Sequence, residues 1–151
     1  MRLLEIRRHA ARDADEDRLS SEGRAQAEDV GRTLAGDYAV VFTSPAHRAA
    51  ETVAWFLRGR GERLPSHDVV PGLMGKSDED RTQARLAAVV GELLDRVPEG
   101  GRALAVGHTP LIERAVLGLT GRRIEALAEC EGVLLMRAED GTIDVEELRI
   151  R

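Results

Sequence analysis

Short apolar segments alternate with amphipathic helical segments along this chain. The apolar segments have the length and composition of buried strands, and they lie at 1–6, 39–43, 69–70 and 103–106. The segments between them carry apolar residues at helical spacing and predict helices over about 20–34, 45–57, 80–97 and 110–119. Two final strands are predicted on either side of a turn at 138–141, at 132–137 and 142–148.

This order of elements predicts an α/β protein. We expect a three-layer sandwich, in which helices cover both faces of a mainly parallel central sheet. The last pair of strands would add an antiparallel strand. A length of 151 residues favours a single domain, which we expect to span 1–151. Hydrophobic residues make up 42%, which is enough apolar surface to form a core.

Charge, hydrophobic pattern and cysteine content argue against nucleic-acid and membrane partners and favour a reducing compartment. The formal net charge of −5 argues against general nucleic-acid binding, which needs a basic surface. No apolar run approaches the roughly 20 residues that span a bilayer, and 1–10 has no secretory-signal pattern, so we expect no membrane association. Cys130 is the single cysteine and is expected to be a packed thiol, which suits a reducing cytoplasm.

Two of the predicted strands end in similar motifs, VVFTSPAHR and ALAVGHTPL. In each, Ser-Pro or Thr-Pro opens a helix, so Ser44 and Thr109 are expected to be N-caps and Pro45 and Pro110 the first helical residues. Both helices would begin beyond the carboxyl ends of parallel strands, where open α/β sheets bind ligands. Because helix N-termini present free N–H groups and partial positive charge, this edge of the sheet favours an anion.

The side chains at these strand ends fit the same ligand. Arg8 and His9 follow the first strand, Arg48 lies one turn into the second helix, and His108 follows the strand at 103–106. Guanidinium groups bind phosphate or carboxylate oxygens in pairs. An anion that also meets an imidazole nucleophile is best matched by a phosphoryl group.

Each of these residues also has an ordinary interpretation. The Arg8–His9 pair could serve a surface or capping role, Arg48 could be a helix-surface charge, and His108 could be a core histidine bonded to backbone. Their joint position at strand ends, beside two Ser-Pro or Thr-Pro helix starts, favours the anion site.

Four segments carry a resemblance to a known family. They occur in the family's order over nearly the whole chain, and they are RHA (8–10), LSSEG (19–23), TSPAHRAAET (43–52) and VGHTP (106–110). On these segments the chain resembles the histidine phosphatase superfamily, also called phosphoglycerate-mutase-like. Little sequence is inserted between Arg48 and His108, and in this respect the chain is most similar to the small phosphohistidine-phosphatase branch.

The resemblance implies a phosphatase that needs neither a metal nor a cofactor. His9 would be the nucleophile and would carry a covalent phosphohistidine intermediate that water hydrolyses. Arg8, Arg48 and His108 would be catalytic groups that hold the phosphoryl oxygens and stabilise the transition state. Thr109 is a further candidate for binding phosphate.

The expected substrate is a small phosphorylated metabolite or a protein phosphohistidine, and Arg12 in the loop after His9 could contact it. The pattern indicates no particular oligomeric state. Arg7 stands where the family usually has an apolar residue; because side chains alternate along a strand, it should face away from Arg8 and be ion-paired or snorkelling.

The sequence departs from the family at the general acid. Larger members carry a glutamate where this chain offers Met74 or Gly75, although Asp78, Glu79 or Asp80 could reach in. A missing acid favours leaving groups that depart easily, such as a phosphoramidate or an aryl phosphate. It also leaves two alternatives open: a phosphate- or phosphoprotein-binding module with attenuated catalysis, and a phosphoglycerate-mutase-type isomerase, which the short chain disfavours.

Overall fold

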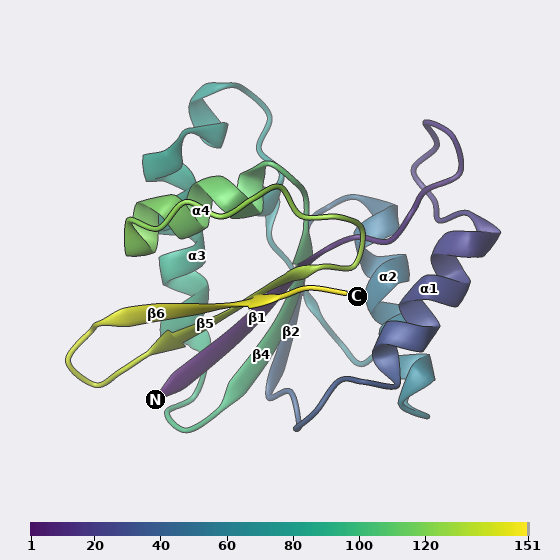
Figure 1. The fold of residues 1–151 in the computed structure, drawn as a ribbon, viewed down its shortest axis with the longest axis horizontal. Coiled ribbons are helices and arrows are strands. Elements are labelled where there is room, and N and C mark those ends of the chain that lie inside the picture. The colour runs from purple at the N-terminus through teal and green to yellow at the C-terminus, as the bar shows by residue number, and fades with distance from the viewer. Residues whose placement is uncertain (151) are drawn as a thin grey trace.

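A computed structural model of the chain describes residues 1–150, so Arg151, the last residue of the predicted domain, lies outside it. Six strands form one sheet in the order β3-β2-β4-β1-β5-β6 (Figure 1). Their bounds are β1 Arg2–Arg8, β2 Val40–Thr43, β3 Asp68–Val69, β4 Arg102–Gly107, β5 Gly132–Arg137 and β6 Ile143–Leu148.

The strand directions agree with the prediction of a mainly parallel sheet. The pairs β1–β4, β2–β4 and β2–β3 are parallel. Strand β5 runs antiparallel to both of its neighbours, β1 and β6, and is therefore the one strand of this sheet that runs against the others. The first four strands thus bring their carboxyl ends to the same edge, where the candidate site lies.

Helices cover both faces of the sheet, and the predicted three-layer α/β architecture is confirmed (Figure 1). Helices α1 and α2 pack together on one face, and α3 and α4 pack together on the other. Their bounds are α1 Ser21–Gly31, α2 His47–Gly59, α3 Gln83–Arg96 and α4 Leu111–Thr120, with short 3₁₀ turns η1 at Pro71–Leu73 and η2 at Glu79–Arg81. Within residues 1–150, no helix combines the length and the apolar character needed to cross a bilayer.

The two expected helix caps are wrong. Helix α2 begins two residues later than predicted, at His47, and α4 begins at Leu111 with Pro110 in the N-cap position. The hydroxyl groups of the expected caps are engaged elsewhere: Ser44 Oγ contacts the ring of His108, and Thr109 Oγ1 donates to Glu113. Ser44 Oγ also accepts a hydrogen bond from Ala46 N at 3.3 Å, so both hydroxyls lie near the helix starts without capping them.

The helix predicted over 80–97 is divided, and the helix predicted to reach residue 34 ends at Gly31. A run of acidic residues lies in the turn η2, and α3 begins after it because Thr82 Oγ1 accepts a hydrogen bond from Arg85 N at 3.3 Å. The acidic run therefore precedes the helix, and of its residues only Asp78 lines the cavity described below.

A carboxylate is fully buried between the sheet and helices α1 and α2. Glu5 has no exposed surface, and its oxygens accept hydrogen bonds from Arg7 Nε at 2.5 Å, Arg102 Nη2 at 2.6 Å and Tyr38 Oη at 2.8 Å. Burial opposes ionisation of Glu5, but the charge of Arg7 and these hydrogen bonds outweigh it and hold the pKa of Glu5 below its ordinary value. Arg7 is ion-paired on the face opposite Arg8, as the alternation along the strand predicted.

We expect Glu5→Ala to destabilise the fold strongly. The substitution would leave the largely buried guanidinium groups of Arg7 and Arg102 without their carboxylate, a change that typically costs about 3 kcal/mol or more. Urea denaturation followed by circular dichroism measures the loss. Glu146→Ala, the same substitution on the exposed strand β6, is the control and should shift the free energy of unfolding by no more than about 0.5 kcal/mol. Equal effects of both variants would contradict a stabilising role for the buried network.

Candidate active site

His9 directly follows β1 at the carboxyl edge of the sheet, and its hydrogen bonds fix its tautomer. The ring is 8% exposed, and Nδ1 lies 2.7 Å from the carbonyl oxygen of Ala10. Because a carbonyl only accepts, Nδ1 carries the proton, and the lone pair is on Nε2. Burial lowers the pKa of His9, and the charges of Arg48, Arg8 and Arg12 lower it further against the opposing effect of the Ala10 carbonyl. The lowered pKa favours the neutral ring of His9, whose Nε2 lone pair faces the guanidinium of Arg48.

His108 follows β4, the strand that pairs with β1, so its ring lies beside that of His9. The ring centroids are 5.3 Å apart with an interplanar angle of 63°. Ser44 Oγ lies 2.7 Å from Nε2 of His108 and Arg48 Nη2 lies 3.4 Å from Nδ1. A guanidinium only donates, so Nδ1 accepts and Nε2 carries the proton. Burial and the neighbouring His9 and Arg48 lower the pKa of His108 to about 4.

Arg48 connects the two imidazoles. Its Nε donates to His9 Nε2 at 3.3 Å, its Nη2 faces His108, and its Nη1 donates to Asp17 at 3.0 Å. Thr52, one turn further along α2, accepts a hydrogen bond from Ala10 N at 3.0 Å and donates to the Arg48 carbonyl at 2.8 Å. The TSPAHRAAET segment therefore fixes α2 directly against the turn that holds His9.

Asp17 was not singled out from the sequence, and it changes the role of one helix end. Its carboxylate accepts hydrogen bonds from the backbone N–H groups of His47 and Arg48, at 3.0 and 3.1 Å. Burial opposes its ionisation, but these bonds to Arg48 and His47 hold the pKa of Asp17 below its ordinary value. The expectation that the N-terminus of α2 is open to an anionic ligand is therefore wrong, because Asp17 already occupies it.

Arg8 is held by the segment that precedes β5. Its Nη1 donates to the Leu127 carbonyl at 2.8 Å and lies 4.0 Å from a carboxylate oxygen of Glu129. The backbone of Arg8 also bonds to this segment, through the Glu131 carbonyl at 2.8 Å and the Cys130 N–H at 3.1 Å. A quarter of the Arg8 side chain is exposed, and the exposed part faces the same cavity as His9.

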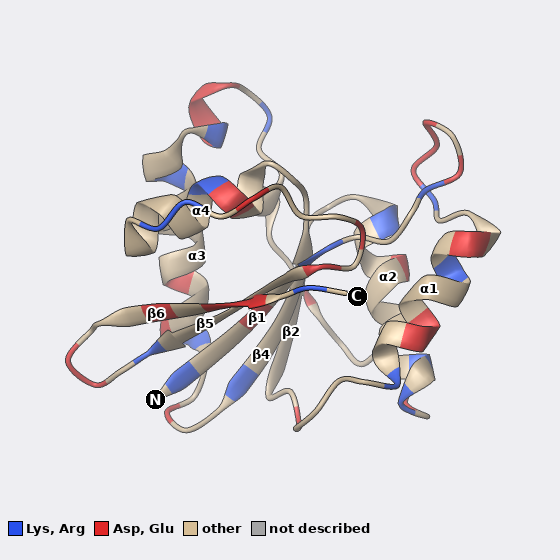
Figure 2. Ribbon diagram, in the orientation of Figure 1, with Lys and Arg blue, Asp and Glu red and all other residues tan. Residues whose placement is uncertain are grey.

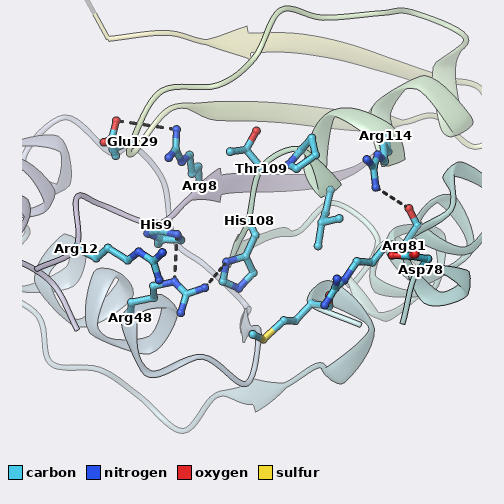
Figure 3. A pocket seen from close by; sticks show the side chains of 13 residues that line it. Arg8, His9, Arg12, Arg48, Asp78, Arg81, His108, Thr109, Arg114 and Glu129 are labelled. Carbon is cyan, nitrogen blue, oxygen red and sulfur yellow. Dashed lines mark hydrogen bonds and ion pairs between the residues drawn. The ribbon is translucent and has the colours of Figure 1, made fainter. Parts of the chain in front are cut away.

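The remaining two sequence candidates, Arg12 and Thr109, line the same cavity. Arg12 is 37% exposed and lies 3.5 Å from Asp15 in its own loop, so it is available at the cavity rim. The Thr109 hydroxyl donates to Glu113, so this contact competes with a ligand for the hydroxyl proton. Figure 3 shows the two histidines with Arg8, Arg12 and Arg48 gathered on one side of the cavity. The structure thus brings the six candidates together, and their roles stay predictions.

The cavity measures about 620 Å³ and is strongly basic. Five arginines line it, and two of these, Arg81 and Arg114, were not among the sequence candidates. Two carboxylates, Asp78 and Glu129, also line it, so its fixed charge is positive although the chain as a whole is acidic. The acidic residues outside the cavity are spread over several segments, among them β6 and the turn before it (Figure 2).

The position of the missing general acid is occupied by an apolar residue. Met74 lines the cavity, and of the three nearby acids only Asp78 also does so. Asp80 instead accepts a hydrogen bond from Lys76 N at 3.0 Å in its own loop. Asp78 is exposed to solvent, whereas a general acid works best where burial keeps its proton in place near neutral pH. Among residues 1–150, no three or more His, Cys, Asp or Glu side chains are grouped so as to hold a metal ion.

Comparison with known proteins supports the resemblance that the motifs carry. The family model for the histidine phosphatase superfamily (branch 1) matches residues 5–74, just under half of the chain. This range contains the motifs around Arg8, His9 and Arg48. The resemblance to this superfamily that the motifs indicate is therefore confirmed. No curated protein sequence matches the chain significantly.

Solved structures share the fold over almost the entire chain. The protein histidine phosphatase SixA complexed with tungstate has a TM-score of 0.76 and 23% identity, covering 97% of this chain and 96% of that chain. Phosphoserine phosphatase from Entamoeba histolytica, in complex with 3-phosphoglyceric acid, has a TM-score of 0.79 at 15% identity, with 100% and 98% covered. Phosphoglycerate mutase from Bacillus anthracis has a TM-score of 0.79 at 15% identity, with 96% and 91% covered. At these identities the likeness establishes the phosphoglycerate-mutase-like fold.

The lowered pKa of His108 predicts a loss of stability on mild acidification. In the unfolded chain a histidine takes up a proton near pH 6.5, whereas His108 in the folded protein does so near 4. Between these values the unfolded state binds more protons, so the free energy of unfolding falls as pH falls. From pH 6.5 to 5 the loss due to His108 is about 1.5 kcal/mol.

Urea denaturation at pH values from 7.5 to about 5, above the range in which most carboxylates titrate, measures this effect. His108→Gln keeps an N–H donor for Ser44 but does not titrate, so its stability should fall less steeply over this interval. An identical slope for wild type and His108→Gln would show that His108 does not remain neutral in the fold.

Proposed function

We propose that this chain is a metal-independent phosphatase that hydrolyses a phosphomonoester or a protein phosphohistidine through a covalent intermediate on His9. The single observation that carries the proposal is the protonation pattern of His9, with the proton on Nδ1 and the lone pair on Nε2 beside the Arg48 guanidinium. The match to the histidine phosphatase superfamily and the phosphatases among the proteins of similar fold support the same activity.

In the first step, Nε2 of His9 attacks phosphorus and the bond to the leaving group breaks in line with it. The Nδ1–H bond to the Ala10 carbonyl stabilises the positive charge that develops on the phosphorylated ring. Arg48 donates to both imidazoles in the free protein, and an incoming phosphoryl group would take over these donors. Arg8 would hold a further oxygen from the other side of His9.

In the second step, water attacks phosphorus, the P–N bond breaks, and phosphate leaves with His9 restored. His108 contributes as a donor once Nδ1 is protonated, because a bound phosphate dianion raises the pKa of a neighbouring imidazole. With Met74 in place of an acid, the leaving group departs with little protonation by the protein. This favours substrates whose leaving groups are stable on departure, namely a phosphohistidine or an activated phosphoester, and disfavours a mutase.

We expect purified protein to hydrolyse p-nitrophenyl phosphate in the presence of EDTA, and His9→Ala to lower kcat by about 10³-fold or more, because the nucleophile is lost. Wild-type protein quenched during turnover should carry acid-labile phosphate, which His9→Ala should lack. His47→Ala is the matched control, because His47 is an exposed histidine on the same helix as Arg48. Full activity of His9→Ala would mean that the assigned nucleophile is wrong.

Asp78→Asn tests whether an acid assists the leaving group. Asp78 is exposed to solvent, so its carboxyl group is not kept protonated by burial. We therefore expect kcat for both p-nitrophenyl phosphate and phenyl phosphate to change by less than about threefold. The measurement is the ratio of kcat for the two esters, since phenolate is the poorer leaving group. A loss confined to phenyl phosphate would identify Asp78 as the general acid.

A second candidate function follows from the same apolar position. A phosphate- or phosphoprotein-binding module would keep the arginines and histidines and lack the acid, as this chain does with Met74. Calorimetry with inorganic phosphate separates the two functions: binding by wild-type protein without turnover of any aryl phosphate would favour the module over the enzyme.

A further inference from the structure

The five arginines of the cavity fall into two groups. Arg8, Arg12 and Arg48 lie near His9, and each has a carboxylate within 4.0 Å. Arg81 and Arg114 lie on the far side of His108 from His9 in Figure 3. Neither forms an ion pair within 4.0 Å among residues 1–150, although the exposed Asp78 lines the same end of the cavity, so both guanidinium groups are available to an anionic ligand.

These two arginines are also held in place. Arg81 donates from Nε to the Met74 carbonyl at 3.0 Å and from Nη2 to the Gly75 carbonyl at 3.4 Å. Arg114 Nη1 donates to the Arg81 carbonyl at 3.1 Å, which joins helix α4 to the turn η2. Both side chains still line the cavity, so their positions are set before any ligand arrives. Preorganised donors bind an anion at a smaller entropic cost than free surface arginines do.

The wall between the two basic groups is largely apolar. Pro110 and Leu111 line the cavity directly after Thr109, and Met74 lines it beside Arg81. Leu111 and Arg114 are three residues apart on α4 and therefore share one face of that helix. A ligand that spans the cavity would meet a basic end near His9, an apolar middle and a second basic end.

From this arrangement we propose that Arg81 and Arg114 form a second anion subsite, and that the substrate is a small phosphoester with a distal carboxylate or phosphate. The proposal rests on the function proposed above, with the phosphoryl group at His9. A cavity of about 620 Å³ is large enough to hold both ends of one small molecule. The apolar wall fits a short hydrocarbon or aromatic spacer between the two anionic groups.

A pair of probes of equal shape tests the subsite. In 4-carboxyphenyl phosphate the distal group is an anion, and in 4-carbamoylphenyl phosphate it is a neutral amide. We expect wild-type kcat/KM to favour the carboxylate by about tenfold or more, as for one charge-assisted hydrogen-bonded contact. The ratio of the two values is the readout, because it cancels effects on the phosphoryl chemistry. A probe with a distal phosphonate in place of the carboxylate distinguishes a preference for the larger dianion.

Variants then assign the preference to residues. Arg114→Gln and Arg81→Gln should each lower the ratio severalfold, and Arg114→Lys should retain more of it than Arg114→Gln. Arg85→Gln is the control, because Arg85 lies on α3 outside this cavity and should leave the ratio unchanged. Arg114→Gln is independent of the loop contacts that Arg81 makes, so it remains informative if Arg81→Gln misfolds. A wild-type ratio near one, or a ratio that survives both glutamine substitutions, overturns the proposal.

Binding separates this proposal from the phosphatase activity. Calorimetry on His9→Ala measures the dissociation constants of both probes without turnover. The subsite is supported if His9→Ala binds the carboxylate probe more tightly than the amide probe and the double variant His9→Ala, Arg114→Gln does not. This result would hold even if the wild-type protein hydrolyses nothing. Equal dissociation constants in His9→Ala overturn the subsite and leave the phosphatase proposal to its own tests.

Discussion

The candidate site depends on one guanidinium placed between two neutral imidazoles. Arg48 faces a ring nitrogen of His9 and one of His108 at once. A guanidinium only donates, so this geometry requires both rings to be neutral. Burial and positive charge both disfavour protonation, so the two effects act together on both rings. The outcome is an imidazole lone pair kept available in a cavity whose charge attracts anions.

The sheet positions the two imidazoles next to each other. Strands β1 and β4 are direct neighbours, and their register pairs Arg8 with Gly107, so the next residues, His9 and His108, emerge side by side. Alternation along β1 sends Arg8 toward the site while Arg7 enters the buried network around Glu5 on the other face. Two adjacent arginines at a strand end are therefore compatible with a packed core, because each has a separate and defined environment.

Much of this could be predicted from sequence, and the failures share a physical reason. The strands, the helices and the meeting of His9, Arg8, Arg48 and His108 follow from local periodicity and from the rule that parallel strands end at one edge. The N-cap prediction for Ser44 failed because a residue distant in the chain, His108, contacts its hydroxyl, and the prediction for Thr109 failed because its hydroxyl donates to Glu113, four residues further on. Local sequence preferences for N-cap residues do not include a side-chain partner that the fold brings in, as His108 is for Ser44.

Asp17, Arg81 and Arg114 escaped notice for a related reason. Each lies in a loop, turn or helix with no motif around it, and its importance comes only from where the fold places it. Arg114 alone carried a usable signal, since it lies on the same helix face as Leu111 and close to His108 in sequence. Sequence reasoning found the six candidates that line the cavity and missed other residues that line or support it.

The loop between β1 and α1 has a mechanical consequence. It leaves the sheet at His9, is closed by the bridge between Arg12 and Leu19, and returns to α2 through the contact of Asp17 with Arg48. The ring of His9 and the guanidinium of Arg48 are thus linked through one short loop. If this loop moved, the two side chains would move together, and the distance between the His9 ring and the Arg48 guanidinium would change little.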